Sequence, residues 1–130
     1  MAKTSGGVRG RYTTQIREAR RSYQQQRQSA YNSLDSQLRE IERRGLTDRE
    51  YNLLSRNVNF LENNPTFGTS RALTNYINDN RRKAMSGEYD ERIMDLSYGL
   101  GGEVVRSMAQ SAAQRDLLPR FRELLRRYRR

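Results

Sequence analysis

The stretch TTQIREARRSYQQQRQSAYNSLDSQLREIERR, residues 13–44, decides the fold that this sequence predicts. Its apolar side chains recur at spacings of three, four and seven residues, as expected for a helix with one buried face. These side chains are Ile16, Ala19, Tyr23, Ala30, Leu34, Leu38 and Ile41. Gly45 follows them as a candidate C-cap, because glycine readily adopts the left-handed conformation that ends many helices. We therefore expect one long helix over residues 13–45.

The first half of this helix is unusually polar. Between Arg20 and Ser29, Tyr23 is the only large apolar side chain, and the other residues are Arg, Gln and Ser. A helix that is polar all round either bridges to something outside the domain or is unstable alone. Residues 1–12, which precede it, are basic and rich in glycine, and they predict an extended arm.

The rest of the chain, residues 46–130, predicts a helical bundle. Thr47 and Glu50 have the spacing of a capping box at the start of a second helix, and Pro65 follows the end of that helix. We expect Phe67 to anchor the next loop, and Asp116 to cap the last helix. Between these points we expect a third helix capped by Thr69 or Ser70, a short acidic helix over residues 88–98, a glycine hinge at 99–102 and a further helix after residue 102. No segment has the alternating pattern of a strand, so the predicted fold class is all-α.

Charge divides the chain into three parts. The sequence has 25 basic and 15 acidic residues, a net charge of +10. Residues 1–34 contribute +6, residues 35–118 contribute −1, and residues 119–130 contribute +5. Nearly all of the basic residues are Arg, whose planar guanidinium can donate two hydrogen bonds to one phosphate. This distribution indicates a neutral helical body with two basic ends, which is typical of a protein that binds a polyanion.

Composition argues against an enzyme. The chain has no Cys and no His, which excludes a thiol nucleophile, an imidazole base and an ordinary zinc site. Asp90, Glu91 and Asp95 cluster in sequence, but a solvated helix face explains them better than a metal site. Gly99 to Gly102 is too short for a phosphate-binding loop. We therefore expect no catalytic residue, no metal and no cofactor. No apolar run is long enough to span a membrane, and the first residues lack the apolar region of a secretory signal.

Two sets of residues are the predicted functional sites. The first set, at the two basic ends, is expected to contact nucleic-acid phosphates: Lys3, Arg9, Arg11, Arg17, Arg20, Arg21, Tyr23, Gln24, Arg27, Arg126, Arg127, Arg129 and Arg130. The second set, on apolar stripes, is expected to form contacts between subunits: Leu100, Val104, Val105, Met108, Ala112, Phe121, Leu124 and Leu125.

The profile resembles the major capsid proteins of rod-shaped and filamentous archaeal viruses. The resemblance lies in the architecture of the whole chain: its length, its helicity, the basic arm from Val8 to Arg11, the polar helix from Thr13 to Gln28 and the apolar body that follows. It implies a coat subunit that packages linear double-stranded DNA in a helical nucleocapsid. It also implies assembly as a homodimer, or as a heterodimer with a related chain, and localisation in the virion, with host cytoplasm during assembly. An enclosing membrane envelope is compatible with it.

Two other classes stay open. The first is a cellular or phage DNA-binding regulator or nucleoid-type protein; Leu46 to Tyr51 resemble the opening of a helix-turn-helix, although the match consists mostly of the capping box. The second is a helical protein-interaction module, such as a phage-encoded inhibitor, whose basic ends would meet an acidic protein. If the first 34 residues are fully engaged on phosphates, the logarithm of the DNA affinity should fall with the logarithm of salt concentration with a slope of roughly −5.

Overall fold

The protein is all-α. The computed structural model describes the backbone of residues 2–86 and 103–129, and the side chains of residues 13–83 and 103–129. These parts form α1 (Ala2–Arg44), α2 (Asp48–Asn63), α3 (Ser70–Ser86), α5 (Glu103–Asp116) and α6 (Leu118–Arg127), and they contain no strand. The predicted acidic helix at 88–98 and the glycine hinge at 99–102 lie outside the described residues.

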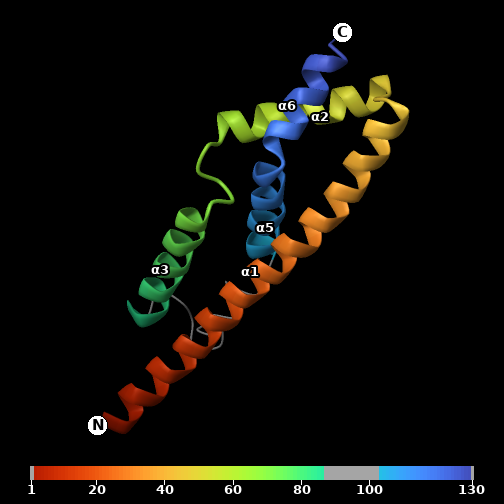
Figure 1. Ribbon diagram of the computed structural model, residues 1–130. Coiled ribbons are helices and arrows are strands. Elements are labelled where there is room, and N and C mark those ends of the chain that lie inside the picture. The colour runs from red at the N-terminus through yellow and green to blue at the C-terminus, as the bar shows by residue number, and fades with distance from the viewer. Residues whose placement is uncertain (1, 87–102, 130) are drawn as a thin grey trace.

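Helix α1 spans the whole length of the molecule (Figure 1). Its 43 residues give it a length of about 65 Å. It ends as predicted at Gly45, which has a φ of 96° and whose N–H donates to the carbonyl of Ile41 at 2.7 Å. The extended arm predicted for residues 1–12 was wrong for the backbone from Ala2 onward. No proline interrupts this segment, so helical hydrogen bonding continues toward the N-terminus from the packed turn at Ile16, at one bond for each residue added.

Two separate hydrophobic clusters hold the other helices against α1. The first joins the N-terminal half of α1 to α3 and α5, and its buried residues are Ala19, Tyr23, Leu73, Ile77, Val105, Met108, Ala109 and Ala112. The second joins the C-terminal half of α1 to α2 and α6, and its buried residues are Leu38, Leu46, Val58, Leu117, Phe121 and Leu124. Figure 1 shows α5 lying between α1 and α3, and α6 lying against α2. The apolar stripe that the sequence predicts on α1 therefore contributes side chains to both clusters, first to one and then to the other along the helix.

Three sets of contacts hold the loop between α2 and α3 in place. Phe67 packs against the first cluster and meets the Phe60 ring edge-on, with ring centroids 6.0 Å apart. Gly68 has a φ of 84°, and its carbonyl accepts a hydrogen bond from the Tyr23 hydroxyl at 2.7 Å. The Arg115 guanidinium donates to the carbonyls of Leu61, Asn64 and Phe67, which closes the C-terminal end of α2. The predicted anchor role of Phe67 is confirmed, whereas Arg115 was not predicted.

The start of α3 follows the sequence prediction, and the start of α6 does not. The Thr69 hydroxyl accepts a hydrogen bond from the N–H of Ala72, so Thr69 caps α3. Asp116 was expected to cap the last helix, but it is the final residue of α5, and α6 has Leu117 at its N-cap position with no side-chain cap. The Asp116 carboxylate is held elsewhere, in a two-bond ion pair with Arg27.

Most of the residues predicted to contact other subunits lie inside the chain's own core. Five of them have side chains at most 7% exposed, because their helices bury those stripes against α1: Val105, Met108, Ala112, Phe121 and Leu124. Leu125 is half-buried and packs against the second cluster. Val104 is 42% exposed, and Leu100 lies outside the described residues. As an intersubunit surface, the predicted set is therefore wrong for the five buried residues.

Candidate nucleic-acid interface

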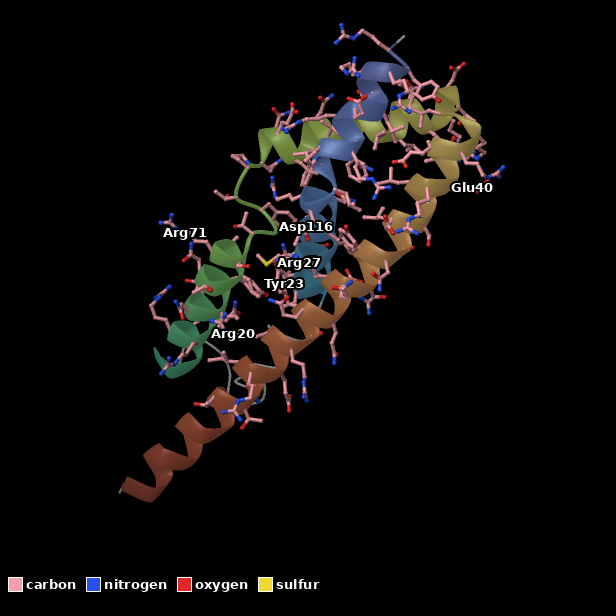
Figure 2. All side chains as sticks on the ribbon, viewed as in Figure 1. Arg20, Tyr23, Arg27, Glu40, Arg71 and Asp116 are labelled. Carbon is pink, nitrogen blue, oxygen red and sulfur yellow. The ribbon has the colours of Figure 1, made fainter. Side chains whose placement is uncertain are left out.

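The N-terminal half of α1 presents three exposed arginines along one side. Arg20 and Arg21 follow Arg17 by three and four residues, and Gln24 follows them by four and three, so all four exposed side chains share one side of the helix. Among the described residues, Arg17 and Arg21 make no ion pair. The Arg20 Nη1 lies 3.5 Å from the Thr74 Oγ1 of α3, and Figure 2 shows this side chain between the two helices. The local reason for this exposure is that Ala19 and Tyr23 face the core, which turns these arginines outward.

Tyr23 was predicted to contact nucleic acid, and the structure places it in the core instead. Its side chain is fully buried, and its hydroxyl donates to the Gly68 carbonyl. The apolar stripe of the sequence already included Tyr23, and the structure confirms that role in the core, so its assignment to nucleic-acid contact was wrong.

Arg27 is also committed within the chain. Its Nε and Nη2 donate to the two oxygens of Asp116 at 3.0 and 2.8 Å, and its guanidinium lies 5.9 Å from the centre of the Tyr23 ring (Figure 2). The hydrogen bond to Asp116 raises the pKa of Arg27 above its ordinary value, while partial burial opposes that rise. The charge of Arg27 is thus compensated within the chain. Arg27 is therefore not a free phosphate ligand, contrary to the sequence prediction.

The C-terminal basic residues differ from Arg17, Arg20 and Arg21 of α1, because carboxylates accompany most of them. Arg126 and Arg127 were predicted to bind phosphate, and both lie close to Glu123, with their nearest nitrogens 2.6 and 3.7 Å from one of its oxygens. The hydrogen bond from Arg126 lowers the pKa of Glu123. Arg122 pairs with Glu62 in the same way, at 3.4 Å. Arg129 is exposed and makes no ion pair among the described residues, while Arg130 lies outside them.

Arg120 fastens α6 to α1 through two carboxylates. Its Nη1 lies 2.6 Å from Asp35, and its Nη2 lies 3.1 Å from Glu42. The hydrogen bond from Arg120 lowers the pKa of Asp35, and the bond to Asp35 raises the pKa of Arg120. The +5 charge of residues 119–130 already counts Glu123, and Asp35 and Glu42 of α1 and Glu62 of α2 offset part of the remainder.

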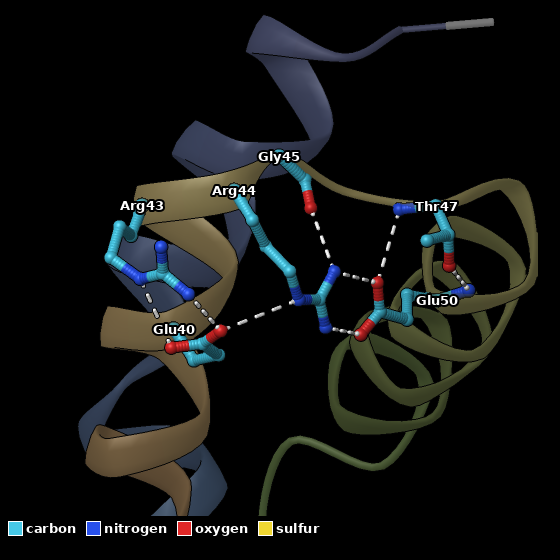
Figure 3. A network of polar contacts seen from close by, with 6 residues as sticks. All are labelled: Glu40, Arg43, Arg44, Gly45, Thr47 and Glu50. Carbon is cyan, nitrogen blue, oxygen red and sulfur yellow. Dashed lines mark hydrogen bonds and ion pairs between the residues drawn. The ribbon is translucent and has the colours of Figure 1, made fainter.

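The segment that resembled a helix-turn-helix opening has a structural role (Figure 3). The Thr47 hydroxyl accepts from the Glu50 N–H at 3.2 Å, and the Glu50 carboxylate accepts from the Thr47 N–H at 3.1 Å, which confirms the capping box. Arg44 donates to both oxygens of Glu50, at 2.9 and 2.6 Å, and these bonds lower the pKa of Glu50 from its ordinary 4.5 to about 2. Glu50 is thus fully used in joining α1 to α2.

Several exposed arginines outside the predicted set also lack ion pairs. Among the described residues they are Arg49 and Arg56 on α2, Arg71 and Arg81 on α3, and Arg106 on α5. In the sequence, these residues lie in the middle part, whose net charge is close to zero, so a count of charge by segment could not reveal them. Only the pairing in three dimensions separates a free guanidinium from a compensated one.

The described residues include an apolar groove and no cluster of metal-binding side chains. A groove of about 300 Å³ between α1 and α2 has a mostly apolar lining that includes Leu34, Ile41 and Leu54, and its one carboxylate is that of Glu50. In the described ranges, no three Cys, His, Asp or Glu side chains come close enough to hold a metal ion. Nor does any helix there have the length and hydropathy needed to cross a membrane. The Lys3, Arg9 and Arg11 side chains lie outside the described set.

Comparisons with protein-family models, with curated proteins and with solved structures found no match to this chain.

Proposed function

We propose that this chain binds the phosphate backbone of double-stranded DNA without sequence specificity, and packages the DNA as a repeating coat subunit. One observation carries the proposal: Arg17, Arg20 and Arg21 have no carboxylate partner among the described residues, whereas most of the described arginines near the C-terminus do. Guanidiniums that are already paired gain little from a phosphate, while free ones release the counterions of the DNA when they bind.

The mechanism is charge neutralisation along a rigid helix. Arg17, Arg20 and Arg21 would contact phosphates, and Gln24 would donate to backbone oxygens between them. The sequence adds Lys3, Arg9 and Arg11 further along the same helix.

The compensation of Arg27 refines the expected salt dependence. Without Arg27, residues 1–34 keep a net charge of about +5, which corresponds to a slope of about −4.5 in a plot of log affinity against log salt concentration.

A matched pair of triple variants tests the phosphate contacts. Arg17→Ala/Arg20→Ala/Arg21→Ala removes three free guanidiniums, and the slope should become shallower by about 3. The control, Arg122→Ala/Arg126→Ala/Arg127→Ala, also removes three exposed arginines, but these are paired. Its slope should stay closer to that of the parent chain. Fluorescence anisotropy with a short duplex of mixed sequence gives the slopes, and equal slopes for the two variants would contradict the proposal.

Packaging is tested separately from binding. Electron microscopy of the full chain mixed with linear DNA should show filaments whose length follows that of the DNA. A discrete complex of fixed size would support a regulator instead, and an absence of any DNA complex would favour the protein-interaction module.

A further inference from the structure

The exposed side of α3 carries a second set of free cations. Arg71, Thr74, Asn78 and Arg81 are spaced three, four and three residues apart, so they lie along one side of this helix. Arg71 and Arg81 are exposed and make no ion pair among the described residues. The two ends of this row are about 15 Å apart along the helix axis.

Within the described ranges, no carboxylate forms an ion pair with either of these two arginines. The one acidic residue of α3 is Asp79, which pairs with Arg82 at 2.9 Å and with Lys83 at 3.2 Å. These contacts lower the pKa of Asp79, with the hydrogen bond from Arg82 as the largest cause. The acidic side chain of α3 is therefore used by its own neighbours.

The basic sides of α3 and α1 adjoin each other. The Arg20 Nη1 of α1 lies 3.5 Å from the Oγ1 of Thr74, which is in the middle of the row on α3. Beneath this contact, the Ala19 and Tyr23 side chains of α1 share a hydrophobic cluster with Leu73 and Ile77 of α3. Because these buried side chains belong to one cluster, the two rows of arginines keep a fixed position relative to each other.

The chemistry of this surface fits several phosphates at once. The five guanidiniums are spread over two helices and are exposed, so they do not enclose a single small anion. Arginine donates to phosphate with two parallel bonds, and hydroxyl and amide side chains such as Thr74 and Asn78 are common contacts to the DNA backbone.

We propose that α3 forms the second half of the DNA-binding surface, and that a duplex lies across α1 and α3 with its phosphates on Arg17, Arg20, Arg21, Arg71 and Arg81. The inference rests on the proposed function, since it names further residues for the same partner. Helix α3 would then bind DNA, although it lies in the middle part of the chain, whose net charge of −1 did not predict such a role.

Two double variants test this inference. Arg71→Ala/Arg81→Ala removes both free arginines of α3, and the salt slope of duplex binding should become shallower by about 2. The control is Arg49→Ala/Arg56→Ala, which removes two exposed arginines of α2 that also lack ion pairs. Its slope should equal that of the parent chain. All four residues are exposed, so thermal melting followed by circular dichroism should give nearly the same Tm for both variants.

The outcomes separate the inference from the proposed function. If the α3 variant binds like the parent while the α1 triple variant does not, the role of α3 is overturned and DNA binding through α1 stands. If the α2 and α3 variants weaken binding equally, the contacts are diffuse and the two-helix surface is overturned. If neither the α1 nor the α3 variant changes the slope, both proposals fail.

Discussion

Tyr23 contributes to the fold through both parts of its side chain. The ring is fully buried in the first cluster, and the hydroxyl donates to the carbonyl of Gly68, itself a buried residue. A buried carbonyl that loses its donor costs more than an average hydrogen bond is worth. This one residue thus ties α1 to the loop between α2 and α3.

Tyr23→Phe should therefore lower the free energy of unfolding by about 1–2 kcal/mol. Urea denaturation measures this change. DNA affinity at a fixed salt concentration should stay the same, because the hydroxyl does not reach the surface. Weaker DNA binding with an unchanged free energy of unfolding would contradict this assignment and indicate that the Tyr23 hydroxyl contacts DNA.

The conformation of Gly68 is required by close packing as well as by its φ of 84°. A Cβ at this position would lie 2.7 Å from the Ser111 Cβ and 3.0 Å from the Ala112 nitrogen. Gly68→Ala should cost about 2–4 kcal/mol, from backbone strain together with overpacking. Gly45→Ala is the control, since its φ is also positive but its Cβ would meet nothing closer than 3.6 Å. It should cost about 1–2 kcal/mol, and equal losses in urea denaturation would contradict the packing argument.

At the scale of elements, α2 is fastened at both ends by arginines that lie outside it. Arg44 holds Glu50 in the capping box (Figure 3), and Arg115 donates to the carbonyl of Leu61 in the last turn and to that of Asn64, the C-cap residue. Helix ends leave backbone groups without partners, and these contacts satisfy several of them. The position of α2 therefore depends on α1 and α5 as much as on its own sequence.

The Arg44–Glu50 contact predicts a specific dependence of stability on pH. The folded state lowers the pKa of Glu50 to about 2, so folding is favoured by its ionised form. The stability that this group contributes is present above pH 4.5 and is lost as the pH falls toward 2. Glu50→Gln should be less stable at neutral pH and should lose part of this acid dependence, as measured by urea denaturation at several pH values. Glu18→Gln is the control, because Glu18 is exposed and makes no ion pair among the described residues; an equal change there would contradict the assignment.

The sequence predicted the elements that local signals define. The capping box at Thr47, the glycine cap at Gly45 and the stop before Pro65 all depend on residues close together in the chain, and all are confirmed. The partners of the arginines could not be predicted in this way. Arg27 and Asp116 are 89 residues apart, and Arg120 and Asp35 are 85 residues apart. Such pairs form only after the helices have packed.

At the scale of the whole molecule, the N-terminal end of α1 extends past the rest of the bundle (Figure 1). Both hydrophobic clusters, as described, use no residue before Ile16. We therefore expect that the first residues can be removed without loss of the fold.

Deletion of residues 2–12 should leave Tm nearly unchanged, because the cluster residues that the structure describes begin at Ile16. It removes Lys3, Arg9 and Arg11, so the salt slope of duplex binding should become shallower by about 3. Thermal melting and anisotropy titrations measure the two effects. A large fall in Tm would mean that this end of α1 contributes to the fold, and an unchanged slope would mean that its cations do not contact DNA.

The two clusters along α1 have a mechanical consequence. A helix held at one point can tilt about that point, but a helix held at two points along its length keeps a fixed axis. The direction in which α1 leaves the bundle is therefore set by packing in both clusters. In a polymer of such subunits, the angle between α1 and the bundle would set the path of the DNA along each subunit. Substitutions in the second cluster, far from any phosphate, would then change the curvature of the packaged duplex.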